Sequence, residues 1–192
     1  MSHVKYSTLA FVVSTTAFGE ADKTVKLYTR DFGMIFALAK SVRLLKSKLK
    51  GALEQGNLLL VSLVKGKDIW RLTDASVEKK IDIRHPELVF FLKTIKLLRS
   101  LVQGEEKNEE LFVIINETFD HLSERVFIGE ELESLECLTA LRMLETLGYG
   151  RHKDSLGISI FEPVSQPLLQ SVFQNKRTIV NLINKSIQDS HL

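Results

Sequence analysis

The alternation of polar and apolar side chains in the first part of the chain predicts β-strands. Residues 5–16 are rich in β-branched and aromatic side chains, and residues 23–29 alternate with the period of two that is typical of a half-buried strand. The turn Arg30-Asp31-Phe32-Gly33 has Asp at an early position and Gly where a positive φ is expected. It leads into an apolar strand at residues 34–39. We therefore predict a strand followed by a β-hairpin.

The next stretch predicts a helix and two further strands. Residues 42–54 have leucines spaced to form one apolar face with lysines opposite, and Gly56 is a candidate helix C-terminal cap. Residues 57–64 form a short apolar run, residues 65–68 a turn, and residues 69–75 a returning strand. Three strands, a helix and two strands are the order of the OB-fold, a five-stranded barrel that binds oligonucleotides.

From His85 onward the apolar spacing becomes helical. Amphipathic segments are predicted at residues 86–102, 109–127, 132–147 and 167–186, whereas residues 158–163 look extended. The predicted fold class is α+β: a five-stranded OB-fold β-barrel in residues 1–80, followed by an all-helical domain in residues 81–192. The junction is expected within residues 76–84.

The charge of the chain differs between these two parts. Residues 1–80 hold 14 Lys and Arg against 7 Asp and Glu, a net of +7, whereas the remainder holds 12 against 17, a net of −5. The two values sum to the +2 of the whole chain. The first part is therefore the candidate for an anionic ligand.

Basic residues around the predicted barrel are the strongest functional candidates. Lysine and arginine on flexible stems give the salt-dependent attraction that non-specific nucleic-acid binding requires. The alternative interpretation is a solvated helix face that keeps the protein in solution. The candidate DNA-binding residues are Lys40, Arg43, Lys46, Lys48 and Lys50, with Arg30, Lys65, Lys67 and Arg71 on nearby turns and strands.

Aromatic side chains of the predicted barrel are candidates for base stacking. The set comprises Tyr6, Phe11, Tyr28, Phe32, Phe36 and Trp70. Most of these are expected in the core, because aromatic residues are favoured in strands for packing. Tyr28 and Trp70 are the two candidates that we select for stacking on nucleobases.

Catalytic, metal and membrane signatures are missing from the sequence. The five histidines are scattered without the spacing of a helical metal pair, and the single cysteine, Cys137, excludes an intrachain disulfide and a multi-cysteine zinc site. Gly148 and Gly150 follow a helix, whereas a nucleotide-binding loop follows a strand. We expect no enzyme activity, no cofactor and no metal. With no membrane-span-length apolar run and no signal-peptide pattern, the expected compartment is the cytoplasm, at the nucleoid.

Several segments together resemble the bacterial recombination mediator RecO. They are GEADKTVKLYTRDFGMIFALAK at residues 19–40, the basic stretch with KSKL, LLLVSLVKGKDIWRLTDA at residues 58–75, and ALRMLETLGY at residues 140–149. The resemblance implies an OB domain followed by a helical domain. It also implies binding of single- and double-stranded DNA, strand annealing, and work with RecR and the single-stranded-DNA-binding protein in loading the RecA recombinase.

The resemblance places Lys40 at the end of the third strand, and Arg43, Lys46 and Lys48 in the basic segment implicated in DNA contact. The chain departs from the family at two places. Ser41 stands where many relatives have Gly, and the region after LGY has no cysteine where many relatives carry a four-cysteine zinc motif.

Two other functions stay open from the sequence. One is a protein-interaction adaptor of the repair machinery with little DNA affinity, which the acidic second part and the missing zinc motif favour. The other is an RNA-binding OB-fold protein, because the basic residues do not distinguish the two nucleic acids.

Overall fold

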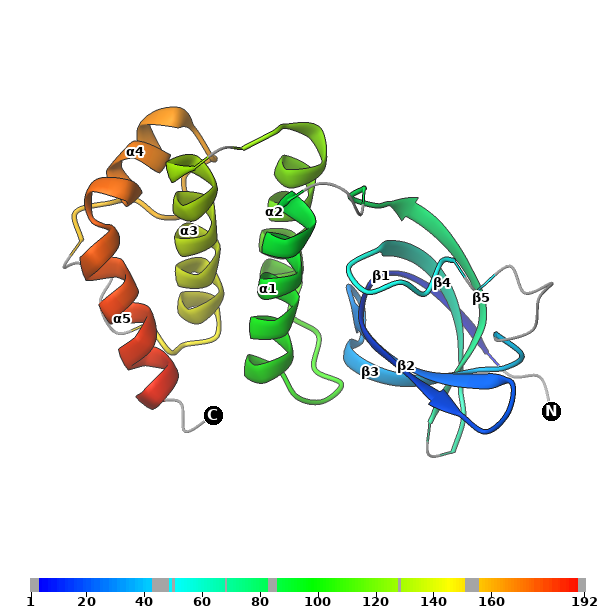
Figure 1. Cartoon of the computed structure of the whole chain (residues 1–192). Coiled ribbons are helices and arrows are strands. Elements are labelled where there is room, and N and C mark those ends of the chain that lie inside the picture. The colour runs from blue at the N-terminus through cyan, green and yellow to red at the C-terminus, as the bar shows by residue number, and fades with distance from the viewer. Residues whose placement is uncertain are drawn as a thin grey trace. The chain divides into compact units, whose positions relative to one another are not determined.

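The chain folds into two compact units. The computed structural model describes residues 4–42, 49, 51–67, 69–82, 86–127, 129–150 and 156–189. One unit comprises Met1–Ile83 together with Val102–Glu109, and the other comprises Arg84–Leu101 together with Glu110–Leu192 (Figure 1).

The first unit is a closed five-stranded barrel, as the sequence predicted (Figure 1). The order around the barrel is β1-β2-β3-β5-β4. Neighbouring strands are antiparallel except β3 and β5, which pair in parallel over three residues, Ala37–Ala39 with Trp70–Leu72. The strands are β1 (Lys5–Phe18), β2 (Asp22–Thr29), β3 (Gly33–Ala39), β4 (Leu58–Lys65) and β5 (Trp70–Lys79).

The barrel interior is built from alternate residues of each strand. Val25 and Leu27 of β2 and Ile35, Ala37 and Ala39 of β3 point inward and are fully buried. β1 is long enough to pair with β4 through its first half and with β2 through its second half. A bulge between Val12 and Ser14 shifts the register, and this shift accounts for the burial of both Val12 and Val13.

The segment predicted as a helix at residues 42–54 lies partly outside the described residues. Its described end, Leu49 and residues 51–53, forms turns, with the Leu53 amide donating to the Leu49 carbonyl at 3.2 Å. Ala52 and Leu53 are buried against the barrel core. Gly56, at a φ of 89°, donates its amide to the Val12 carbonyl at 2.9 Å and so joins this segment to β1.

Residues 102–109, which connect two helices in sequence, pack with the barrel. The amide of Met34 donates to the Gly104 carbonyl at 3.1 Å, and the Tyr28 hydroxyl donates to the Asn108 carbonyl at 3.3 Å. The predicted division after residue 80 placed this segment in the helical domain. In the structure it bonds to residues of the barrel strands.

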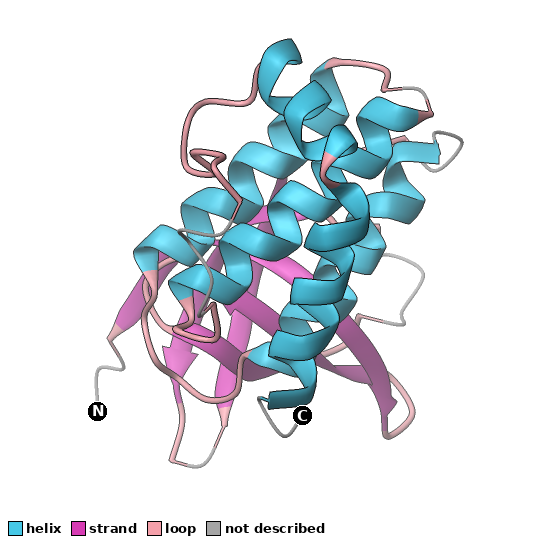
Figure 2. Cartoon of the chain, turned by 90° about the vertical axis from the view of Figure 1, so that its left-hand side faces the viewer, coloured by secondary structure: helices cyan, strands magenta, loops and turns pink. Residues whose placement is uncertain are grey.

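The second unit is helical (Figure 2), and α3 lies between α1 on one side and α4 and α5 on the other (Figure 1). The rings of Phe91 and Phe119 pack edge to face at 4.9 Å, and the hydroxyls of Thr118 and Thr139 form a buried hydrogen bond of 3.0 Å. Among the described helices, none has the length and apolarity needed to span a membrane. The helices are α1 (Pro86–Leu101), α2 (Glu109–Glu124), α3 (Glu130–Thr146), α4 (Gln166–Gln174) and α5 (Lys176–Asp189).

Two predictions for the end of the chain were wrong in detail. The single helix predicted at residues 167–186 is broken at Asn175, whose backbone amide and side-chain amide both donate to the Ser171 carbonyl. Residues 158–163 contain a turn rather than a strand. The buried guanidinium of Arg142 in α3 donates to the carbonyls of Ile160 and Glu162 at 2.6 and 2.5 Å. These carbonyls are therefore not available to the amides of a neighbouring strand.

Candidate nucleic-acid interface

The outer surface of β2, β3 and β5 carries cations around an exposed aromatic ring. Because Val25, Leu27, Ile35 and Ala37 point inward, the residues between them point outward. The register pairs Lys26 with Phe36, and Thr24 with Leu38. Leu38 in turn pairs with Arg71 of β5, so these side chains form one continuous patch. We call Lys26, Phe36, Leu38, Lys40 and Arg71 the β2–β3–β5 face.

Two cations of this face, Lys40 and Arg71, are available to an anion. Lys40 directly follows β3, and both Lys40 and Arg71 are exposed. Within the described part of the chain, neither residue forms an ion pair with a carboxylate. Lys67, in the turn between β4 and β5, is likewise exposed. Lysine and arginine on the surface of a barrel are the groups that contact a phosphate backbone.

The backbone after Lys40 turns sharply at Ser41. Its φ of 56° lies in the left-handed region, which L-residues adopt at a cost and glycine adopts freely. The Ser41 amide donates to Oδ1 of Asp22 at 2.7 Å, a bond that holds the turn beside β2. Glycine, which the resemblance implies at this position, would adopt the same conformation freely.

Two other predicted cations are engaged by acids of the barrel unit. Arg30 Nε lies 3.6 Å from Oδ1 of Asp31, and Lys65 Nζ lies 3.1 Å from Oε2 of Glu105. The Lys65 ammonium also lies 5.1 Å from the centre of the Trp70 ring. Glu105 thus places an intramolecular carboxylate where a phosphate would otherwise meet Lys65.

Tyr28 and Trp70, the predicted stacking residues, are buried. Tyr28 has no exposed surface, and burial raises the pKa of its hydroxyl above the ordinary value. Trp70 is 3% exposed and donates its Nε1 hydrogen to Oε1 of Glu105 at 2.9 Å, while its ring contacts those of Tyr6 and Phe32. The prediction that these two residues stack on bases was therefore wrong, because neither ring has a free face for a base.

Four of the predicted DNA-binding residues, Arg43, Lys46, Lys48 and Lys50, lie outside the described residues. Their place relative to the β2–β3–β5 face therefore stays a prediction. The described set brings Lys40 and Arg71 to one face and places Arg30 and Lys65 beside carboxylates.

Phe36 was one of the six aromatic candidates in the sequence but not one of the two selected for stacking, and its neighbour Lys26 was not among the predicted cations. The Phe36 ring is 56% exposed, although it lies on a strand that is apolar throughout. The strand period of two could have indicated the exposure of Phe36, since side chains alternate between the two faces of a strand and Phe36 points to the face opposite Ile35 and Ala37. The sequence did not show which phase faces the core, because both phases are apolar.

The chain does not fit the zinc site that the resemblance implies. Cys137 is the single cysteine, and it is buried in α3. Burial, followed by the charge of Glu136, raises the pKa of its thiol and so disfavours the thiolate that binds a metal. In the ranges that the structure describes, no three His, Cys, Asp or Glu side chains converge as metal ligands.

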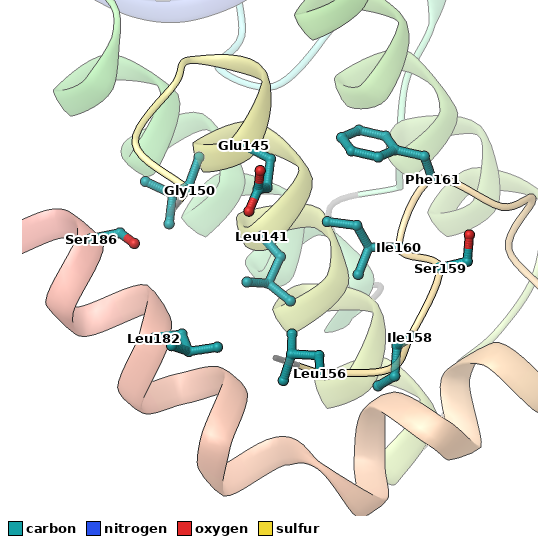
Figure 3. A pocket seen from close by; sticks show the side chains of 11 residues that line it. Leu141, Glu145, Gly150, Leu156, Ile158, Ser159, Ile160, Phe161, Leu182 and Ser186 are labelled. Atoms are coloured by element: carbon teal, nitrogen blue, oxygen red, sulfur yellow. The ribbon is translucent and has the colours of Figure 1, made fainter. Parts of the chain in front are cut away.

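A pocket of 210 Å³ opens in the helical unit between α3, residues 156–161 and α5 (Figure 3). Its walls are mostly aliphatic, with Leu141, Leu182 and Ile158 among them. Glu145 is the ionisable residue of its described lining, with the hydroxyls of Ser159 and Ser186 nearby. A nucleophile, a base and a group that orients the base do not meet among these lining residues.

Comparison with known proteins finds a family model that matches the barrel and relatives that are named for DNA repair. Residues 1–80 match the family model described as "Recombination protein O N terminal". Proteins named "DNA repair protein RecO" from Chlorobium limicola and Dehalococcoides mccartyi are each 31% identical to the chain, over 147 and 149 residues. One from Thermodesulfovibrio yellowstonii is 28% identical over 148 residues. These alignments cover 74–75% of this chain and 55–58% of the relatives, so the chain spans about half the length of the curated relatives it matches.

Proposed function

Through its N-terminal barrel, residues 1–80, the chain belongs to the recombination protein O family, and we propose that it is a non-enzymatic DNA-binding protein of recombinational repair. The names of the relatives support a repair role. The observation that carries DNA binding is the β2–β3–β5 face, where Lys40 and Arg71 stand exposed and, among the described residues, without carboxylate partners.

The proposed activity is binding of single- and double-stranded DNA, followed by annealing of complementary strands and assistance to recombinase loading. Phosphate neutralisation by lysine and arginine is independent of sequence and applies to both forms of DNA. The proposed protein partners are RecR and the single-stranded-DNA-binding protein, as the resemblance implies. The supporting feature for DNA is the separation of charge, with a net of +7 in residues 1–80.

The double variant Lys40→Glu/Arg71→Glu tests this function. Binding of labelled single-stranded DNA is measured by fluorescence anisotropy across a salt series. Each phosphate contact on a single strand contributes about 0.7 to the slope of log K against log salt, so the loss of two contacts should lower the slope by about 1.4. The loss of affinity should be similar for unrelated DNA sequences, because phosphates carry no sequence information.

The matched control is Lys96→Glu/Arg99→Glu, which makes the same change of charge on exposed residues of α1. The control should retain the salt slope of the unaltered chain. If the two double variants lost DNA affinity equally, the loss would follow from net charge alone, and the assignment of the binding site to the β2–β3–β5 face would be refuted. No binding by the unaltered chain at low salt would refute the function.

The adaptor function has one observation in its favour. The pocket between α3 and α5 is lined mainly by aliphatic side chains and fits an apolar side chain of a protein partner (Figure 3). Retention of protein partners by a chain that shows no DNA binding at low salt would favour this function. Competition between RNA and DNA of equal length distinguishes DNA binding from the RNA-binding alternative, which stronger binding of RNA would favour.

A further inference from the structure

Phe36 is an exposed aromatic ring on the face where oligonucleotides bind five-stranded barrels of this kind. Its neighbours on β3, Met34 and Ile35, are 2% and 0% exposed, whereas Phe36 is 56% exposed. A single exposed apolar side chain is common on protein surfaces and is not a site by itself. The groups around Phe36 distinguish it.

Those groups are cationic and lie on both flanks of the ring. The ammonium of Lys26, its partner on β2, lies 5.3 Å from the ring centre. On the other flank Leu38 separates Phe36 from Lys40 along β3, and Leu38 pairs with Arg71 of β5. Residues two apart on a strand are about 7 Å apart on one face, so Leu38, with its partner Arg71, is the next position from Phe36, and Lys40 lies about 13 Å from Phe36 along the strand. At these spacings Lys40 and Arg71 can contact phosphates of a strand whose base stacks on Phe36.

We propose that Phe36 is a base-stacking residue through which the β2–β3–β5 face binds single-stranded DNA in preference to duplex DNA. This proposal rests on the proposed function and adds the strand selectivity of the same face. The Phe36 ring remains more than half exposed with Lys26 above it, so a nucleobase has surface to cover. Every base presents a π-face, and such stacking tolerates any sequence.

The preference for single strands follows from where the bases lie. In a duplex each base is stacked between its neighbours, and exposing one costs unstacking energy. A ring that stands on a sheet surface reaches the faces of bases only when the strand is open. Duplex DNA therefore uses the cations of the face without using Phe36.

The test compares Phe36→Leu with Phe36→Trp. Leucine keeps an apolar side chain but lacks a π-face, whereas tryptophan keeps the stacking surface. With a labelled thymidine oligonucleotide of about 16 nucleotides, the upper range of site size for one barrel of this kind, Phe36→Leu should bind about 5- to 150-fold more weakly. Phe36→Trp should bind within about twofold of the unaltered chain, and both variants should bind duplex DNA unchanged.

The salt slope and tryptophan emission distinguish base stacking from phosphate contact, and a control variant tests whether the loss of any exposed ring would have the same effect. The salt slope should stay unchanged in Phe36→Leu, because Phe36 neutralises no phosphate. The emission of Phe36→Trp should be quenched by single-stranded DNA, measured against the unaltered chain, whose one tryptophan, Trp70, is 3% exposed. The control for the loss of an exposed phenyl group is Phe161→Leu, at a residue of the helical unit that is 44% exposed.

The outcomes also separate this proposal from the one on which it rests. Normal binding by Phe36→Leu, with a lowered salt slope in Lys40→Glu/Arg71→Glu, would overturn stacking and leave DNA binding in place. Equal losses for single-stranded and duplex DNA in Phe36→Leu would overturn the selectivity. Normal DNA binding by Phe36→Leu with loss of a protein partner would assign the ring to protein docking, and no DNA binding by the unaltered chain would overturn both proposals.

Discussion

Substitution of Gly33 by alanine tests how closely residues 102–109 pack against the β2–β3 turn. Gly33 has a φ of 67°, and a Cβ at this position would stand 2.7 Å from the carbonyl carbon and 2.8 Å from the amide nitrogen of Glu106. Such contacts are shorter than real Cβ atoms show, and the obstructing atoms are backbone. The segment must therefore move away from the turn.

The expected loss of stability has two parts beyond backbone strain. Overpacking of a tight contact costs about 1–3 kcal/mol. Displacement of the segment also breaks the adjacent 3.1 Å hydrogen bond from the Met34 amide to the Gly104 carbonyl, worth about 1 kcal/mol. Together they predict a loss of about 2–4 kcal/mol in the free energy of unfolding, in addition to the left-handed strain of about 1–2 kcal/mol.

Gly19→Ala is the matched control, because Gly19 has a φ of 59° and nothing within 4 Å of its added Cβ. It carries the backbone strain alone, so the difference between the two variants isolates the packing. Urea unfolding followed by the fluorescence of Trp70, which is hydrogen-bonded to Glu105 of the same segment, measures both variants. Equal destabilisation by the two substitutions would refute the packing of residues 102–109 on the turn.

Two further predictions concern the same unit. Ser41→Gly should raise the free energy of unfolding by about 0.5–1 kcal/mol, since it removes left-handed strain of about 1–2 kcal/mol and adds some freedom to the unfolded chain; a lower urea midpoint would contradict this reasoning. Glu105→Gln should strengthen DNA binding about 1.4- to fivefold at low salt, because the exposed pair with Lys65 is worth about 0.2–1 kcal/mol and glutamine can still accept the Trp70 hydrogen bond. Anisotropy titrations test it, and unchanged or weaker binding would show that Lys65 takes no part in the interface.

The local patterns of the chain were sufficient for the barrel and its hairpin. Alternation located β2, and Asp31 and Gly33 located the turn, because these signals act between near neighbours. Gly33 adopts the positive φ that the turn pattern predicted. The net charge of +7 in residues 1–80 likewise needed only counting.

Contacts between residues distant in sequence decided the rest. The burial of Tyr28 and Trp70 depends on residues 102–109, which lie next to the barrel only after folding. The exposure of Phe36 depends on which phase of an apolar strand meets the core, and the register with β2 and β5 settles that. Arg142 of α3 binds the carbonyls of residues 160 and 162 and so gives a segment that looked extended the shape of a turn. Strand phase, burial and hydrogen-bond partners are properties of the packed chain, since each needs two segments to meet.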